Sequence, residues 1–405
     1  MSPRLLFAVA DDWLFVQFRL PLAQELLRRG YHLSVACRIT GCEAPIRDAG
    51  IDLYPVPFAR GSVSPLAISR ACLAARQVIR QARPSLLQAV ALWPIMVGWL
   101  GALAAPRPPW INLITGLGSL FTQGRPGLRL RSARMTLELL SRMALSHPSA
   151  HNVFQNQDDL AYFTRRRLAP AHRSRVIPGS GVDTEAWSPR PEPAPPPYVL
   201  VFVGRILRDK GVSDLVQASA LLSRRGLQHI LRLVGDVDPD NPSSLHPDQI
   251  HAWQQAGAVE WLGQRDDVLA QMSSAHAVVL PSYREGLPKT LLEAGVAERP
   301  VVTCDVPGCR DLVTNGINGL LVPPRDPPAL ASAIERLLRE PDLRRRLALA
   351  HSAIVRERYS NHVIIPQFLA LYAEILGTAG GASCLRDHEH PSRSPLTQGE
   401  HRPKS

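Results

Sequence analysis

The run PSYREGLPKTLLEA, which ends at residue 294, combines residue types that can bind a phosphorylated ligand. Gly286 and a proline two residues later indicate a turn after an apolar run, and Lys289 then opens a predicted helix. A helix start presents free backbone N–H groups and a positive dipole end to an anion. Glu285 and Glu293, with seven residues between them, can accept hydrogen bonds from hydroxyl groups of the same ligand. A capped helix with solvated glutamates is the alternative.

A second run, VFVGRILRDKG, ends at Gly211 and places two cations, Arg205 and Lys210, between a predicted strand and a predicted helix. Arginine can bind two phosphate oxygens at once, and lysine supplies a compact positive charge. The chain has only three lysines against 43 arginines, and both lysines outside the C-terminal tail fall in these two runs. The two cations are therefore suited to neutralise a leaving diphosphate. Surface charges that flank a helix are the alternative.

The elements that must position these residues follow a regular alternation of strand and helix. Such alternation predicts parallel sheets with right-handed crossovers, and ligands bind at the carboxyl ends of the strands in sheets of this kind. Because the alternation restarts after Gly179, we expect two doubly wound α/β domains. The expected strands lie at 5–10, 32–36, 86–92, 110–114, 198–203, 230–234, 277–280 and 300–303, and the expected helices at 20–29, 68–81, 212–224, 290–297, 330–338 and 363–376.

Composition predicts the boundaries of the domains. The predicted parts are an N-terminal domain at 1–182, a Pro-rich linker at 183–197, a C-terminal domain at 198–360, a helix at 361–377 that crosses back to the first domain, and a disordered tail at 378–405. The uncharged stretch 85–106 is long enough to span a bilayer. Pro94 and Gly98 interrupt it, and we therefore expect a buried strand followed by a core helix.

Charge is distributed unevenly along the chain, whose formal net charge is +11. Residues 1–182 contain 22 arginines, no lysine and nine acidic residues, whereas the remainder is close to neutral. This asymmetry predicts that the N-terminal half meets an anionic partner: nucleic acid, a membrane surface or a phosphorylated acceptor. Six cysteines without a Cys-x-x-Cys pair exclude a disulfide framework and a zinc signature. The short apolar run before Asp11 is too short for a secretory signal, and we expect the protein in the cytosol.

The two motifs together resemble the donor site of the retaining glycosyltransferases of family 4, which have the GT-B fold. That fold consists of two doubly wound, Rossmann-like α/β domains that face a cleft. The resemblance spans about residues 4–377 and extends to a subgroup that elongates undecaprenyl-diphosphate-linked sugars, including the N-acetylgalactosaminyltransferase of bacterial N-glycosylation and O-antigen and capsule enzymes. The motifs similar to that subgroup are TGLGSLFT at 115–122, FQNQDD at 154–159, GSGVD at 179–183 and SYREGLP at 282–288.

The resemblance implies roles for individual residues of the C-terminal domain, which would bind the nucleotide sugar. Arg205 and Lys210 would bind the UDP diphosphate, Glu293 the ribose hydroxyls and Glu285 the sugar, so that Arg205, Lys210 and Glu285 are the catalytic candidates. The remaining donor-binding candidates are Gly204, Gly286, Leu287 and Lys289.

In the N-terminal domain the resemblance assigns Thr115 and Gly116 to the donor sugar. Many relatives place a histidine where this chain has Thr115. The resemblance also implies that the enzyme needs no metal for catalysis. It implies no other cofactor either, because the UDP-sugar counts as a substrate. Asp236 and Asp238 match the Asp-x-Asp motif of metal-dependent GT-A enzymes, but their position predicts a loop at a strand end.

The activity that the resemblance implies is transfer of a hexose or N-acetylhexosamine from a UDP-sugar, with retention, to a polyprenyl-diphosphate-linked saccharide. The enzyme would act in assembly of a bacterial surface polysaccharide, O-antigen or capsule, peripherally on the cytosolic face of the inner membrane. The segment GRPGLRLRSAR at 124–134 mixes arginine with leucine and is the predicted contact with anionic lipid. Its candidate residues for the membrane and acceptor are Arg125, Arg129, Arg131 and Arg134.

Two other interpretations stay open at this point. A nucleotide-sugar 2-epimerase shares the two-domain fold and would consume the UDP-sugar without an acceptor. An inactive binding or scaffold protein would keep the fold and the basic face, and segment 124–134 would then be a solvated loop. Nucleic-acid binding is not expected, because the sequence has no recognition motif and no basic patch interleaved with aromatic residues.

Overall fold

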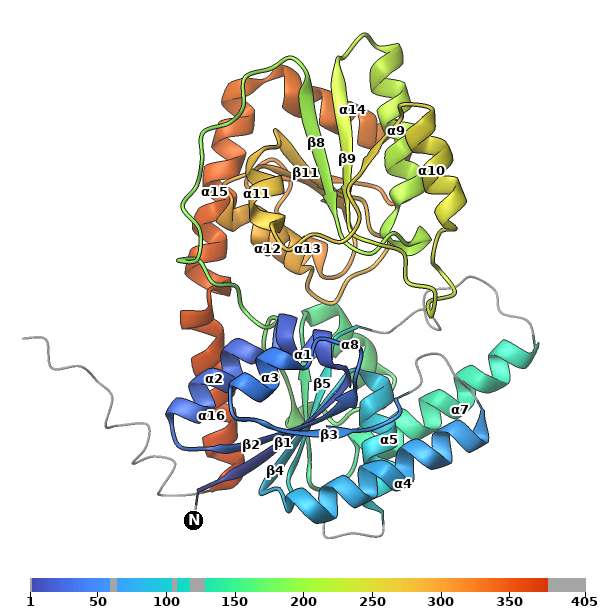
Figure 1. The fold of residues 1–405 in the computed structure, drawn as a ribbon, viewed down its shortest axis with the longest axis vertical. Helices are drawn as coiled ribbons and strands as arrows, with labels where there is room; N and C mark the ends of the chain where they lie inside the picture. The colour runs from blue at the N-terminus through green and yellow to red at the C-terminus, as the bar shows by residue number, and fades with distance from the viewer. Residues whose placement is uncertain (1, 59–63, 104–107, 117–127, 378–405) are drawn as a thin grey trace, which may run out of the picture.

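The computed structural model describes residues 2–58, 64–103, 108–116 and 128–377, without the side chains at 128–134, 136 and 137. Two α/β domains are stacked along the long axis of the molecule, the N-terminal domain below and the C-terminal domain above in the view of Figure 1. Each domain has a parallel sheet with helices on both faces, as the alternation in the sequence predicts.

The N-terminal sheet has seven parallel strands in the order β3-β2-β1-β4-β5-β6-β7. Its central strands are buried along their whole length, because helices cover both faces. The strands are β1 (Arg4–Asp11), β2 (His32–Arg38), β3 (Asp52–Pro55), β4 (Leu86–Val90), β5 (Trp110–Ile114), β6 (Ala150–Phe154) and β7 (Ser174–Val176). The helices are α1 (Asp12–Phe18), α2 (Leu20–Arg28), α3 (Ala44–Asp48), α4 (Pro65–Ala82), α5 (Leu92–Ala102), α7 (Leu128–Leu145), α8 (Gln157–Arg165) and the 3₁₀ turn η1 (Ala171–Arg173).

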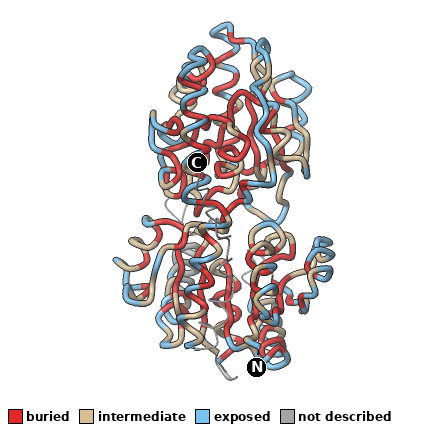
Figure 2. The backbone as a smooth tube through the Cα atoms, turned by 90° about the vertical axis from the view of Figure 1, so that its left-hand side faces the viewer, coloured by how far each residue is buried: buried red, intermediate tan, exposed pale blue. Residues whose placement is uncertain are grey.

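The C-terminal sheet has six parallel strands in the order β10-β9-β8-β11-β12-β13. Its strands are β8 (Tyr198–Val203), β9 (His229–Val234), β10 (Glu260–Trp261), β11 (Ala277–Leu280), β12 (Val301–Cys304) and β13 (Leu320–Val322). Its helices are the 3₁₀ turn η2 (Arg208–Lys210), α9 (Val212–Arg224), α10 (Pro247–Gln255), α11 (Val268–Ser273), α12 (Lys289–Val296), α13 (Cys309–Leu312), α14 (Pro327–Arg339) and α15 (Pro341–Tyr359). Figure 2 shows buried chain running through the interior of both domains, with exposed chain on the outer helices and loops.

The uncharged stretch 85–106 forms strand β4 and helix α5 as far as the structure describes it, in agreement with the sequence prediction. Within the described ranges no helix has both the length and the apolar character needed to cross a membrane. The sequence prediction missed helix α1, which begins directly after β1 at Asp12. The sequence prediction also assigned no element to strands β3, β6, β7, β10 and β13.

The Pro-rich segment before β8 is bound to the C-terminal domain and is not a free spacer. Glu192 pairs with the buried side chain of Arg344. Arg299 donates hydrogen bonds from Nη2 to the carbonyl oxygens of Arg190, at 2.9 Å, and Pro191, at 3.1 Å. These contacts fix the path of the chain between the two domains.

Helix α16 (Asn361–Leu376) returns to the N-terminal domain after α15 and packs into its hydrophobic core (Figure 1). Ile364, Phe368 and Tyr372 are fully buried there, and the Tyr372 hydroxyl donates a hydrogen bond to Gln88 of β4. The chain therefore crosses between the domains twice, once before β8 and once before α16.

Candidate active site

The start of helix α12 is held in place from two sides. The Thr290 hydroxyl donates a hydrogen bond of 3.0 Å to the carbonyl oxygen of Val203 at the end of β8. On the other side, Nε2 of the buried His351 on α15 lies 2.8 Å from the carbonyl oxygen of Leu291. Pro288 directly precedes the helix, where its missing N–H costs no hydrogen bond. The N-terminal end of α12 is thus a fixed positive dipole end next to β8.

The two sequence motifs meet through one ion pair. Lys210 Nζ lies 2.5 Å from Glu285 Oε1, and the two side chains are 21% and 11% exposed. A backbone hydrogen bond of 2.9 Å from Tyr283 to the carbonyl oxygen of Asp209 holds the same two segments together. Because β8 and β11 are neighbours in the sheet, the turns that follow them lie side by side and bring the cation and the carboxylate together.

Gly211 allows this close approach of the two turns. Its φ is +70°, and an added Cβ would lie 2.9 Å from the carbonyl carbon of Pro281 and closer still to the oxygen. Any side chain at this position would separate the turn after β8 from the turn after β11. The glycine in the second motif is therefore required by local geometry.

Arg205 is paired with a carboxylate from the next loop. Its Nη1 lies 2.6 Å from Asp238 Oδ2. Asp236 and Asp238 follow strand β9, and the backbone N–H of Ile206 donates to the carbonyl oxygen of Asp236 at 2.9 Å. The Asp-x-Asp motif is therefore part of a loop at the end of a strand. No group of three or more His, Cys, Asp or Glu side chains in the described ranges is arranged to hold a metal ion.

Lys289 and Glu293 lie one turn apart on α12, with 3.2 Å between Nζ and Oε1. Burial raises the pKa of Glu293, and the positive charge of Lys289 opposes this shift. Lys289 Nζ also lies over the ring of Phe18 in α1, 5.7 Å from its centroid. The first turn of α12 thus faces the N-terminal domain.

The Thr115-Gly116 segment follows β5 and packs against the donor loop, defined as residues 284–288. A Cβ added to Gly286 would lie 2.5 Å from Gln155 Oε1, 2.7 Å from the carbonyl carbon of Thr115 and closer still to its oxygen. A Cβ on Gly116 would lie 3.8 Å from the backbone nitrogen of Gly286. Leu287 is buried, and its Cδ2 lies 2.5 Å from the place that a Cβ on Gly179 would take. Residues of both domains therefore converge on the donor loop.

Two family models match the chain, one to each domain. Residues 17–180 match the glycosyl transferase 4-like domain, and residues 197–340 match the glycosyl transferases group 1. The chain belongs to glycosyltransferase family 4. A curated relative of this glycosyltransferase is the N,N'-diacetylbacillosaminyl-diphospho-undecaprenol alpha-1,3-N-acetylgalactosaminyltransferase of Campylobacter jejuni. It is 25% identical over 375 residues, which cover 89% of this chain and 95% of the relative.

Solved structures with the same fold include GT-B glycosyltransferases. Sucrose-phosphate synthase from Thermosynechococcus elongatus superposes with a TM-score of 0.76 at 22% identity, covering 92% of this glycosyltransferase and 99% of that chain. HepE of Anabaena, in complex with UDP and glucose, superposes with a TM-score of 0.70 at 18% identity, covering 92% and 100%. The predicted GT-B fold is therefore confirmed.

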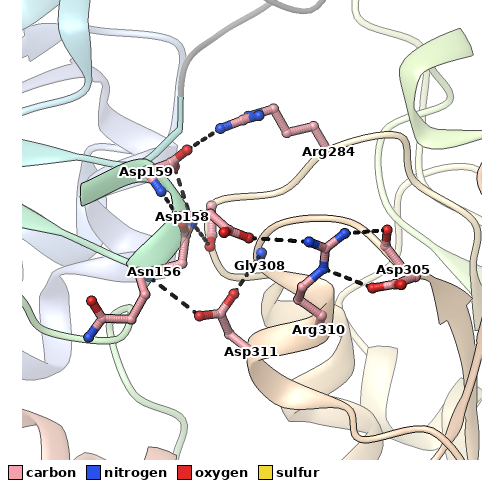
Figure 3. A network of polar contacts seen from close by, with 10 residues as sticks. Asn156, Asp158, Asp159, Arg284, Asp305, Gly308, Arg310 and Asp311 are labelled. Atoms are coloured by element: carbon pink, nitrogen blue, oxygen red, sulfur yellow. Dashed lines mark hydrogen bonds and ion pairs between the residues drawn. The ribbon is translucent and has the colours of Figure 1, made fainter. Parts of the chain in front are cut away.

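Residues at the start of α8 in this glycosyltransferase contact the donor loop, and the sequence had assigned them no role. Asn156 Nδ2 donates a hydrogen bond of 2.7 Å to the carbonyl oxygen of Gly286. Asp159, which is fully buried, forms an ion pair with Arg284. Figure 3 shows the pair of Asp159 and Arg284 between the two domains. The only sequence signal for them was the FQNQDD motif, which had been noted for its resemblance to the family.

A second contact between the domains was also missed. Arg38 lies at the end of β2, and its Nε is 2.8 Å from Oδ1 of the buried Asp11. Its Nη1 is 3.0 Å from Oδ2 of Asp240, an exposed residue of the C-terminal domain. The hydrogen bonds and charges of both carboxylates raise the pKa of Arg38 against the opposing effect of burial.

The predicted membrane residues lie largely beyond what the structure describes. Arg125 lies outside the described residues. Arg129, Arg131 and Arg134 belong to helix α7, but their side chains are not among those described.

Proposed function

We propose that this glycosyltransferase moves a hexose or N-acetylhexosamine from a UDP-sugar, with retention, to a polyprenyl-diphosphate-linked saccharide. The observation that carries the proposal is the pair formed by Lys210 and Glu285 at the start of α12. A cation for the diphosphate and a carboxylate for the sugar stand side by side there. In the proposed complex this arrangement would bracket the bond between the anomeric carbon and the phosphate oxygen.

In the proposed reaction that bond breaks, and the electron pair leaves with UDP. A hydroxyl of the acceptor forms the new bond to the anomeric carbon on the same face, and its proton passes to the departing phosphate. Lys210, Arg205 and the N-terminus of α12 stabilise the negative charge that develops on the diphosphate, and no metal takes part. Glu285 holds the sugar hydroxyls, and Glu293 holds those of the ribose.

Arg205 must exchange partners for this role. It is paired with Asp238 and would turn from that carboxylate to the diphosphate when the donor binds. Its side chain is 41% exposed, so the change costs little desolvation. The nature of the donor is supported by HepE, which shares this fold and was solved with UDP and glucose. The acceptor is supported by the Campylobacter relative, which is named for an undecaprenyl-diphosphate-linked substrate.

The experiment that tests the proposal is a donor panel. Purified protein is incubated with UDP-sugars, each with and without an undecaprenyl-diphosphate-linked sugar, and the release of UDP and the mass of the lipid product are measured. We expect UDP release that depends on the lipid. Release without any acceptor would indicate an epimerase or a hydrolase, and binding of UDP-sugars without turnover would indicate a binding protein.

We also propose that the N-terminal domain rests on the cytosolic face of the inner membrane. Helices α4 and α7 both pack against α5 and carry exposed apolar side chains, among them Leu73 at 63% and Met135 at 71% exposure. Leu139 and Met143 extend the apolar row along α7. Helix α4 has three arginines and no acidic residue. Exposed apolar groups beside unopposed arginine suit an anionic lipid surface.

Liposome binding tests this surface. The protein should bind vesicles of anionic phospholipid more tightly than vesicles of phosphatidylcholine, and less tightly as salt rises, because each basic residue contributes about 1 kcal/mol near such a surface. The double substitution Leu73→Glu and Leu139→Glu should weaken binding about 10-fold or more, and so should Arg129, Arg131 and Arg134 changed to Glu. Ile317→Glu, at an exposed apolar position of the C-terminal domain, is the control. Equal binding by all variants would refute the assignment.

A further inference from the structure

Two contacts from the N-terminal domain engage the residues on either side of Glu285 in the donor loop. On one side Asp159 pairs with Arg284 (Figure 3). On the other side Asn156 donates its hydrogen bond to the carbonyl oxygen of Gly286. Asn156 and Asp159 are 1% and 0% exposed. The residue between these two anchored positions is the one that binds Lys210.

The C-terminal domain closes off the other side of the donor loop. A Cβ added to Gly308 would lie 2.6 Å from the carbonyl oxygen of Gly286 and 2.7 Å from that of Glu285. The backbone N–H of Glu285 donates to the carbonyl oxygen of Pro307 at 3.2 Å. The loop is therefore confined between Gly308 and Asn156, and its carbonyl groups have little room to rotate.

We propose that Asn156, Asp159 and Arg284 are positioning residues that bring Glu285 into its working geometry only when the two domains are closed. The contacts join residues of different domains, so they form on closure and break on opening. Closure thereby fixes the peptide groups on both sides of Glu285. The proposal rests on the proposed function for its activity measurement, but the structural contact can be tested without it.

A neighbouring ion pair across the same interface is exposed. Arg310 Nη1 lies 3.7 Å from Asp158 Oδ2, and the two side chains are 44% and 45% exposed. Exposed pairs of this kind contribute little, whereas loss of one partner from a buried pair leaves an uncompensated charge. Asp158 and Arg310 therefore provide a matched control next to Asp159 and Arg284.

The experiment compares Asp159→Ala, Arg284→Ala and the double variant with Asp158→Ala and Arg310→Ala. Small-angle scattering measures domain closure, calorimetry measures UDP affinity, and thermal unfolding checks the fold. With the donor and acceptor identified by the panel, kcat and KM are measured for each variant. Asn156→Ala adds a variant that removes the hydrogen bond without changing the charge.

We expect kcat to fall on the order of 10- to 100-fold in each single variant at Asp159 or Arg284. Loss of the contact would shift Glu285, and a small shift of a group at the reacting centre lowers the rate by about this factor. The double variant should be no worse than the single ones, because both remove the same contact. UDP affinity should change less than about threefold, since the diphosphate ligands remain in place. The variants should also scatter as more open molecules, and the control pair should behave as wild type.

Wild-type turnover together with unchanged scattering in Asp159→Ala and Arg284→Ala would overturn the proposal. So would losses that multiply in the double variant, because the two residues would then act separately. If wild-type protein turns over no UDP-sugar, the proposed function fails. The scattering comparison still decides whether these residues hold the domains closed.

Discussion

Replacement of Gly286 by alanine should impair closure of the domains while leaving each domain intact. The added Cβ would lie 2.5 Å from Gln155 Oε1 and 2.7 Å from the carbonyl carbon of Thr115. Both groups belong to the N-terminal domain. The Gln155 side chain can move, but the Thr115 carbonyl is part of the backbone after β5 and cannot yield cheaply. Gly286 does not have a positive φ, so alanine causes no strain within the loop itself.

The size of the effect follows from the cost of overpacking, about 1–3 kcal/mol for an added group without room. Because the clash exists only in the closed arrangement, this cost falls on the equilibrium between open and closed domains. At about 1.4 kcal/mol per factor of ten, the equilibrium constant for closure falls about 5- to 150-fold. Turnover should fall by up to the same factor, whereas the unfolding of each domain should change little.

The assay combines turnover, UDP titration and thermal unfolding of Gly286→Ala. UDP affinity should stay close to wild type, because Lys210 and Arg205 lie on the C-terminal domain and are not displaced. Gly319→Ala is the contrast, since its Cβ would lie 2.7 Å from Val301 and Val313 within the same domain. That variant should lower the unfolding temperature. Wild-type turnover of Gly286→Ala would refute the contact of the donor loop with the N-terminal domain.

Three further predictions concern the C-terminal domain. Arg205→Ala should lower kcat about 100- to 1,000-fold, the range for loss of one group that stabilises developing charge, with an unchanged unfolding temperature; wild-type rates would remove Arg205 from the site. Gly211→Ala should destabilise the protein by more than about 2 kcal/mol, because φ is +70° and the new Cβ meets a backbone carbonyl. Gly226→Ala is the control, because Gly226 has a φ of +78° with open space around it, and the change should cost only about 1 kcal/mol. Equal unfolding temperatures of the two variants would contradict a clash at Gly211. Burial lowers the pKa of His351 to about 4 from 6.5, so the folded state holds it neutral, and the stability from this group is lost as pH falls from 6.5 through 4. This loss amounts to about 3 kcal/mol. In denaturant unfolding between pH 7 and 4, the free energy of unfolding should decline less with falling pH for His351→Gln than for wild type. The same pH dependence in both proteins would contradict the role of His351.

The sequence determined the fold class, the four inner strands of each sheet and the positions of the two motifs, whereas the outer strands β3, β6, β7, β10 and β13 were not predicted. Each of these depends on neighbours in the chain: an apolar run gives a buried parallel strand, and a glycine turn followed by a helix gives an anion site. Gly211 and Lys210 were identifiable for this reason. Helix α1 was missed although Asp11 and Asp12 stand at its start, because its seven residues are too few for a clear helical period.

Tertiary structure alone decided which side chains meet. Arg205 pairs with Asp238, 33 residues away, and Arg284 pairs with Asp159, 125 residues away in the other domain. The types of these residues allow many partners, and their choice depends on the order of the strands and on how the domains close. The sequence placed cations and carboxylates at the ends of strands, where the fold exposes them. Burial decides the pairing of carboxylates and cations. A buried charge such as Asp159 is stable only with a cation beside it, and the facing domain supplies that cation.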